Sequence, residues 1–301
     1  MKTIKHAVFL ALMIAPLAAQ AALQVLACEP EWAALADEIG GDKVKTSSAT
    51  HALQDPHYIQ ARPSLIAKVR RADLLICSGA QLEIGWLPML LRRGNNPAVT
   101  PPNPGFMEAS SYVNRLDATD AVDRAQGDIH PQGNPHIQTS PYNIKLVAMA
   151  LAERLAQLDT ANADFYRLRL EDFIGRWDRA IAAWEVRAAP LRGTRVIAHH
   201  KSWVYLQDWL GMGEVATLEP VPGIPPTATH LSGLLHRFEG TDSADFIIHA
   251  PFQSDKPSLW LSERTGIPAV MLPLTVGGSD QATDLFSFFD DILDRLLTAG
   301  Q

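Results

Sequence analysis

The sequence predicts an α/β protein of two lobes, each with a mainly parallel sheet flanked by helices, joined by a long helical spine. Three observations lead to this fold class. The chain of 301 residues exceeds the usual size of one domain. In its first and last parts, short apolar runs alternate with amphipathic stretches, which is typical of parallel sheets. Between them, residues 142–174 contain no Gly or Pro and carry apolar residues at helical spacing.

The first 21 residues have the pattern of a secretory signal peptide. Lys2 and Lys5 precede an apolar run that ends in the small residues around Ala21. Removing this segment changes the formal charge from -7 to -9, and an acidic surface argues against a nucleic-acid partner. We therefore expect a soluble periplasmic protein. An alternative cleavage before Cys28 would give a lipid-anchored form.

Residues 22–143 are expected to form the N-terminal lobe. An apolar strand at 23–28 precedes a helix that ends at the pair Gly40 and Gly41, and Pro63 begins a second helix before the strand at 74–77. Cys28 and Cys77 both end strand-like runs. In an oxidising compartment they can form one disulfide, or they can remain two buried thiols.

The remaining elements follow in the same way. Residues 144–190 should form the linking spine, in two helices, with apolar residues of the first at Leu146, Met149 and Leu155 and those of the second running from Tyr166 to Trp184. Residues 191–301 should form the C-terminal lobe, in which strands and helices alternate again and a final helix begins near Leu285. Ligands of such sheets gather at the carboxyl ends of the strands.

Three histidines occupy that kind of position. His57 lies in a loop just before the Pro63 helix, His136 lies in a turn-rich loop before the first spine helix, and His200 follows the strand ValIleAla. A single loop histidine is more often solvated than liganded. Three together fit zinc, because neutral imidazole suits this ion and a tetrahedral site needs about four donors.

The motifs resemble one known family over nearly the whole mature chain: the periplasmic solute-binding proteins of zinc and manganese ABC transporters, cluster A-I. DPHYIQARPS, GNPHIQTSPYN and HHKSWVYL are similar to its three histidine ligand segments. The resemblance implies that His57, His136 and His200 bind the metal. It also implies a membrane ABC permease as partner and a protein that is no enzyme. We further expect a monomer.

In that family, the fourth ligand, where one exists, is a carboxylate near the start of the last helix. Asp284 is the better candidate and Asp280 its competitor, while a plain helix cap is the alternative role for Asp284. His249 stands where relatives often have an acid. A third histidine at His200 is the zinc pattern of the family, and two carboxylates are typical of its manganese members. The resemblance therefore favours Zn²⁺ over Mn²⁺.

The chain departs from the family in one loop. Many zinc members carry a long His-rich segment between the first two ligands, whereas this chain has only Asp128, Ile129 and His130 there. A second metal-collecting region is therefore not expected. A secreted zinc hydrolase is the alternative from another class, since three histidines and water are a catalytic arrangement. A fourth protein ligand would leave no position for that water and favours reversible capture.

Overall fold

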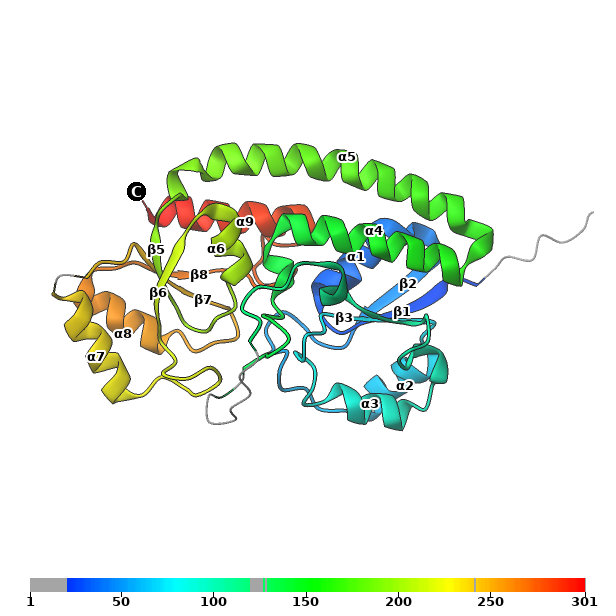
Figure 1. Ribbon diagram of the computed structural model, residues 1–301, viewed down its shortest axis with the longest axis horizontal. Coiled ribbons are helices and arrows are strands. Elements are labelled where there is room, and N and C mark those ends of the chain that lie inside the picture. The colour runs from blue at the N-terminus through cyan, green and yellow to red at the C-terminus, as the bar shows by residue number, and fades with distance from the viewer. Residues whose placement is uncertain (1–20, 120–126, 128, 241, 301) are drawn as a thin grey trace, which may run out of the picture.

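The computed structural model describes residues 21–119, 127, 129–240 and 242–300. Apart from Ala21, the predicted signal peptide lies outside these residues. Two α/β lobes lie side by side along the long axis of the molecule, and one long helix, α5 (Ala163–Ala188), runs along both of them on one side (Figure 1). The predicted fold class is confirmed.

The N-terminal lobe contains a four-stranded parallel sheet in the order β2-β1-β3-β4. Alternate side chains of the central strands point to opposite faces, and both faces are buried. Leu26 and Leu75 pack toward α2 and α3, whereas Val25 and Ile76 pack toward α1. The elements are β1 (Leu23–Ala27), α1 (Pro30–Gly40), β2 (Val44–Ser48), α2 (Pro63–Arg71), β3 (Leu74–Cys77), α3 (Leu87–Gly94) and β4 (Phe106–Glu108).

The C-terminal lobe repeats this plan in the strand order β6-β5-β7-β8, again all parallel. Ile197 and Ile247 bury the face covered by α7 and α8, while Val196 and Ile248 join the core on the other face. The elements are β5 (Arg195–Ala198), α6 (Val204–Leu210), β6 (Gly213–Thr217), α7 (Ala228–Phe238), β7 (Phe246–His249), α8 (Lys256–Thr265), β8 (Ala269–Met271) and α9 (Leu285–Ala299).

The spine consists of α4 (Pro141–Leu158) and α5 (Ala163–Ala188). The predicted apolar stripe of α5 is confirmed, with its aromatic residues buried from Tyr166 to Trp184. For α4 the stripe is partly wrong, because Leu146 and Met149 are exposed and a different face is buried. Apolar residues occupy more than one face of α4, so spacing alone could not select the covered one. The buried apolar residues of α4 include Ile144, Val147, Ala148, Leu151 and Leu155.

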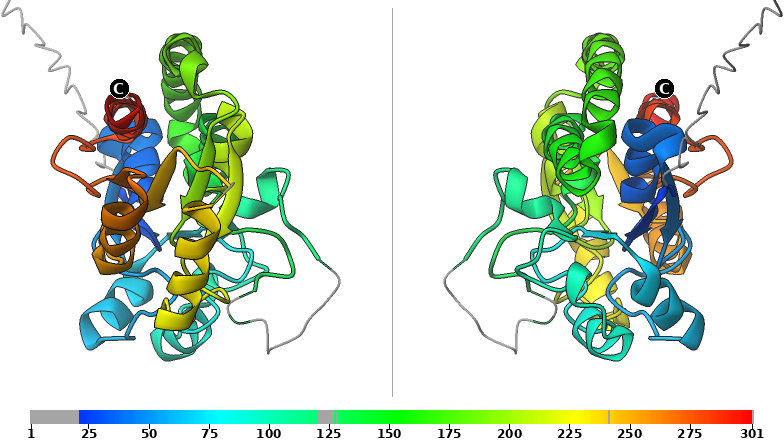
Figure 2. Two further views of the ribbon diagram at one scale, coloured as in Figure 1. Left: turned by 90° about the vertical axis from the view of Figure 1, so that its left-hand side faces the viewer. Right: turned by 90° about the vertical axis from the view of Figure 1, so that its right-hand side faces the viewer.

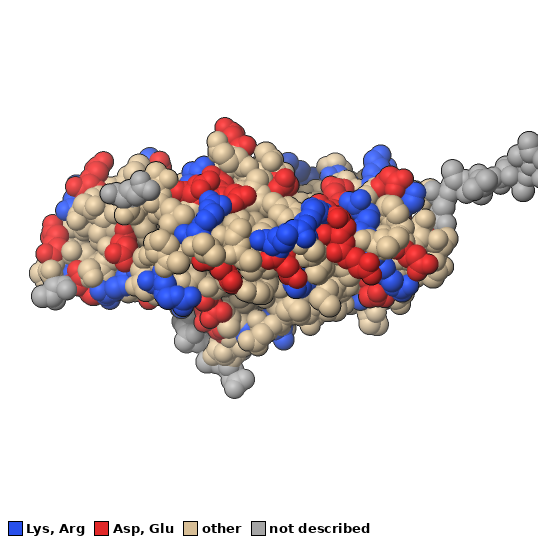
Figure 3. All heavy atoms as spheres, turned by 90° about the horizontal axis from the view of Figure 1, so that it is seen from above, with Lys and Arg blue, Asp and Glu red and all other residues tan. Residues whose placement is uncertain are grey.

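Ion pairs connect the spine to both lobes. Arg176 of α5 pairs with Glu38 of α1, and Arg187 bonds to Asp290 and Asp294 of α9. Figure 3 shows acidic and basic groups interleaved over this face of the molecule. One continuous apolar core runs beneath it through both lobes. The lobe boundaries predicted at residues 143 and 190 stay predictions. Among the described helices, none is long and apolar enough to cross a membrane.

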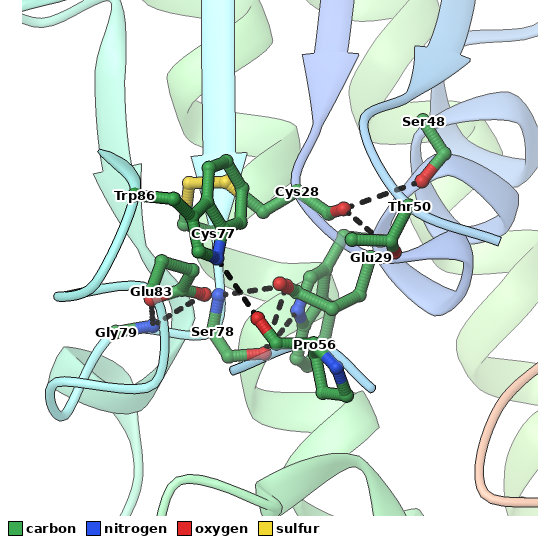
Figure 4. The surroundings of a disulfide bond; sticks show 11 residues. Cys28, Glu29, Ser48, Thr50, Pro56, Cys77, Ser78, Gly79, Glu83 and Trp86 are labelled. Carbon is green, nitrogen blue, oxygen red and sulfur yellow. Dashed lines mark hydrogen bonds between the residues drawn. A yellow bond between two sulfur atoms is a disulfide. The ribbon is translucent and has the colours of Figure 1, made fainter. Parts of the chain in front are cut away.

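Cys28 and Cys77 form a disulfide that joins the ends of β1 and β3, with their Cα atoms 4.7 Å apart (Figure 4). Glu29 and Glu83 lie beside it and are buried. Ser78 donates hydrogen bonds to Glu29 through its backbone N–H and its hydroxyl, and Gly79 donates to Glu83. Burial, together with the charge of Glu83, raises the pKa of Glu29 well above its usual range, and burial raises the pKa of Glu83 to about 7.

Candidate metal centre

The three predicted histidines come from three separate segments that meet between the lobes. His57 lies in the loop from β2 to α2, and His136 lies just before a short 3-10 helix at Ile137–Thr139 that leads into α4. His200 lies two residues beyond the end of β5. His57 and His200 therefore stand at the carboxyl edges of two different parallel sheets. Figure 2 shows the sheets of the two lobes from the two ends of the molecule.

The structure brings these three rings together. The ring centroids of His57 and His136 are 5.6 Å apart, those of His57 and His200 are also 5.6 Å apart, and those of His136 and His200 are 5.8 Å apart. One ring nitrogen from each residue lies within 4.8 Å of the other two. Two nitrogens bound to one tetrahedral zinc ion lie about 3.3 Å apart, given bonds of about 2.0 to 2.1 Å. If the three rings moved closer together, their nitrogens could bind one zinc ion.

The loop that carries His57 fixes the orientation of its ring. Asp55 Oδ1 lies 2.7 Å from His57 Nδ1 and also accepts the backbone N–H of His57. An ionised carboxylate only accepts hydrogen bonds, so Nδ1 carries the hydrogen and Nε2 presents its lone pair. Burial is the largest single influence on Asp55 and raises its pKa, but the side-chain and backbone hydrogen bonds from His57, together with the charges of His57 and His200, keep the pKa of Asp55 below its usual value. Trp86 donates to the carbonyl of Pro56 and anchors this loop.

His200 has an equivalent carboxylate partner in the other lobe. Glu219 Oε2 lies 2.7 Å from His200 Nδ1, and both side chains are nearly buried. The same carboxylate oxygen accepts the backbone N–H of Gly223 at 2.8 Å, which ties it to the following loop. His200 is therefore also held with Nε2 free to donate its lone pair.

His136 is the most buried of the three, with 1% of its surface exposed. Neither of its ring nitrogens has a hydrogen-bond partner among the described residues. Burial, followed by the neighbouring histidines, lowers the pKa of His136 well below its ordinary value. A buried neutral imidazole without a partner is a costly arrangement that a bound cation would relieve.

Asn134 holds the His136 loop against the His200 segment. Its side-chain oxygen accepts the backbone N–H of His136, and its amide donates to the carbonyl of Lys201 at 2.7 Å. The hydroxyl of Tyr205 donates to the carbonyl of Asn134 at 2.6 Å. The tyrosine five residues after His200 thus helps to hold the loop that carries His136 in position.

Asp284 is placed differently from the three histidines. Its carboxylate accepts the backbone N–H and the hydroxyl of Ser287, in a capping box that begins α9. It is exposed and does not belong to the group of ligand atoms within 4.8 Å of one another. The alternative role of Asp284 as a helix cap is the one observed. Asp280 is exposed as well, and neither it nor the buried His249 belongs to that group.

Three further residues were not assigned to the site from the sequence. Asp55 stands two positions before His57, and a carboxylate so close to a candidate ligand in the sequence is a signal that could have identified it as a hydrogen-bond partner. Glu219 lies 19 positions from His200, and no sequence signal connects the two. His130 was named only as part of the short segment where many zinc members have a His-rich loop. Its Nε2 lies 3.3 Å from His57 Nε2, and the two rings are stacked with centroids 5.4 Å apart.

Comparison with solved structures supports this fold. The structure of a protein described as ZnuA superposes with a TM-score of 0.74 at 22% identity, covering 91% of this chain and 99% of that chain. The Mn-bound periplasmic metal binding protein from Candidatus Liberibacter asiaticus gives a TM-score of 0.73 at 18% identity, covering 92% of this chain and 99% of that one. Both show that the two-lobed arrangement is shared.

Comparison of sequences identifies a relative and the family. The manganese ABC transporter substrate-binding lipoprotein PsaA of Streptococcus pneumoniae is 21% identical over 269 residues, which is 89% of this chain and 84% of PsaA. The family described as ZnuA, zinc-uptake complex component A periplasmic, matches residues 25–299. That match covers both lobes, the spine and all three clustered histidines. The chain therefore belongs to the family described as ZnuA.

Proposed function

We propose that this protein captures one zinc ion with His57, His136 and His200 and delivers it to the membrane permease of an ABC transporter. The observation that carries the proposal is the meeting of three imidazoles from separate segments, two of them oriented by carboxylates. Such outer partners fix the tautomer and increase the basicity of ligating histidines. Because the ligands come from both lobes, binding cross-links the lobes without covalent chemistry.

Ligand type supports zinc as the preferred cargo. Imidazole suits zinc, whereas manganese favours carboxylate and water oxygens. Asp55 and Glu219 are the carboxylates bonded to the cluster, and both already accept hydrogen bonds from the histidine rings. Manganese remains the competing cargo, because PsaA is described as a manganese transporter protein.

The relatives also bear on location and partner. PsaA is described as an ABC transporter substrate-binding lipoprotein, which supports export and delivery to a permease. In this chain the sulfur of Cys28 is bonded to Cys77, so it is not available for a lipid. We therefore favour a soluble monomer in the periplasm, released after removal of the signal peptide.

Metal titration tests the proposal. Metal-free mature protein should bind about one equivalent of zinc, measured by competition with a chromogenic chelator, and should bind manganese more weakly. His136→Ala and His200→Ala should each weaken zinc binding beyond the roughly 10- to 100-fold typical of changes in outer partners. His236→Ala, on the exposed side of α7, is the matched control. Unchanged zinc affinity in both site variants would contradict the assignment.

The pH dependence of zinc affinity follows from the protonation of the ligands. Histidine must be neutral to bind metal, so protons compete with zinc as the pH falls. Burial lowers the pKa of His136, so this ligand stays available to a lower pH than an exposed histidine. Zinc affinity should therefore decrease as the pH falls through the histidine range. Affinity that stays constant from pH 7.5 to 5 would argue against a histidine site.

A further inference from the structure

The three-histidine cluster opens toward solvent on two sides. One cavity of about 430 Å³ is lined by His136, His200 and Lys201, among others, and one of about 460 Å³ is lined by His57 and Tyr58. His130 lines both cavities. Its partly buried side chain therefore lies between the two openings, next to the point where a metal would bind.

The distance between two nitrogens indicates what His130 does there. His130 Nε2 and His57 Nε2 are 3.3 Å apart, which is the separation of about 3.3 Å expected for two imidazoles on one tetrahedral zinc ion. Since Asp55 keeps the hydrogen on His57 Nδ1, His57 Nε2 accepts a hydrogen bond, and His130 Nε2 donates it. The same nitrogen becomes a metal donor when the His130 ring adopts its other tautomer.

The clustered side chains leave one coordination position without a protein donor. Zinc takes four donors in closed sites, and three are supplied by His57, His136 and His200. The carboxylate of Asp284 already accepts hydrogen bonds from Ser287 at the start of α9. Asp55 and Glu219 already accept hydrogen bonds from Nδ1 of His57 and of His200, respectively.

We infer that His130 is the fourth ligand of the captured metal, supplied by the loop between the two cavities. The inference rests on the proposed function of the cluster. His130 is not within the group whose ligand atoms all lie within 4.8 Å of one another, so its ring must move toward His136 and His200 as the ion binds. A site closed by four imidazoles leaves no position for an activated water and selects against oxygen-preferring ions.

Two measurements on His130→Ala test this inference with the full mature chain. Zinc affinity should fall by more than the roughly 10- to 100-fold that is typical of changes in outer partners. The visible absorption of the cobalt-substituted protein should also weaken and shift, because replacing an imidazole by water changes the ligand field and favours a higher coordination number. His236→Ala, with an exposed histidine on α7, should change neither quantity.

The outcomes separate the two proposals. If wild-type protein binds neither zinc nor cobalt, the proposed function itself fails. If wild-type protein binds both ions and His130→Ala binds them equally well, only the role of His130 is overturned. A variant with weakened zinc affinity but an unchanged cobalt spectrum would likewise overturn it, because His130 would then position His57 without contacting the metal.

Discussion

At the scale of single residues, two carboxylates control which histidine nitrogens face the proposed metal position. Asp55 and Glu219 each accept a hydrogen bond from an Nδ1 atom at 2.7 Å, so that His57 and His200 both present Nε2. His136 lacks such a partner among the described residues and depends on its buried surroundings to remain neutral. A carboxylate partner therefore orients two of the proposed ligands, whereas burial keeps the third one neutral.

Glu219→Gln tests the role of one carboxylate. An amide can still accept the Gly223 N–H, but it loses the negative charge that stabilises the Nδ1–H tautomer of His200. Zinc affinity should decrease by about 10- to 100-fold, with little change in the circular dichroism spectrum. Glu239→Gln, at the exposed end of α7, serves as the control. Equal affinities for the two variants would exclude an orienting role for Glu219.

At the scale of elements, the carboxyl ends of the strands and the starts of the following helices carry the site, as expected for parallel sheets. The last helix is the exception. Asp284 begins α9 as its N-cap, with Ser287 completing the capping box. A carboxylate that caps a helix and one that binds a metal look alike in the sequence, because both precede an amphipathic run.

Asp284→Ala distinguishes the two roles. Loss of an N-cap should lower the free energy of unfolding by about 1 kcal/mol, measured by urea denaturation of the metal-free protein. Zinc affinity should stay within about twofold of wild type if the carboxylate only caps α9. Asp280→Ala should leave both quantities nearly unchanged. A large loss of zinc affinity in Asp284→Ala would restore the four-ligand set that the sequence predicts.

At the scale of the whole molecule, one continuous core and the spine restrict how far the lobes can move. The core includes residues from β1 to α9, and α5 is paired to α1 and α9 by Arg176 and Arg187. Binding should therefore act through small shifts of the ligand loops, while the sheets keep their places. The cluster joins segments from both lobes, so a bound ion adds a link between them.

Zinc should accordingly raise the thermal stability of the folded protein. Free zinc at 1,000 times its dissociation constant stabilises the native state by about 4 kcal/mol, which corresponds to an increase in Tm on the order of 10 °C for a chain of this size. Calorimetry of the mature protein with and without zinc measures the shift. His57→Ala should lose most of it. A shift of equal size in that variant would place the stabilising ion elsewhere.

Local sequence patterns were enough to predict the fold class, the long helices between the lobes and the three histidines that the structure brings together. These features depend on local patterns: apolar periodicity, Gly and Pro breaks, and short motifs whose spacing lies within a few residues. The face of α4 that is buried and the pairing of Cys28 with Cys77 depended on contacts between segments far apart in the chain.

The immediate surroundings of the three histidines follow from the three-dimensional packing of the chain. It placed Glu219 on His200 and His130 beside His57, from 19 and 73 residues away, and it kept Asp284 at the start of α9. Such choices depend on distance and hydrogen-bond direction in space, which no local pattern encodes. The residue types that a metal site requires are therefore visible in the sequence. Which side chains surround and complete the site depends on tertiary packing.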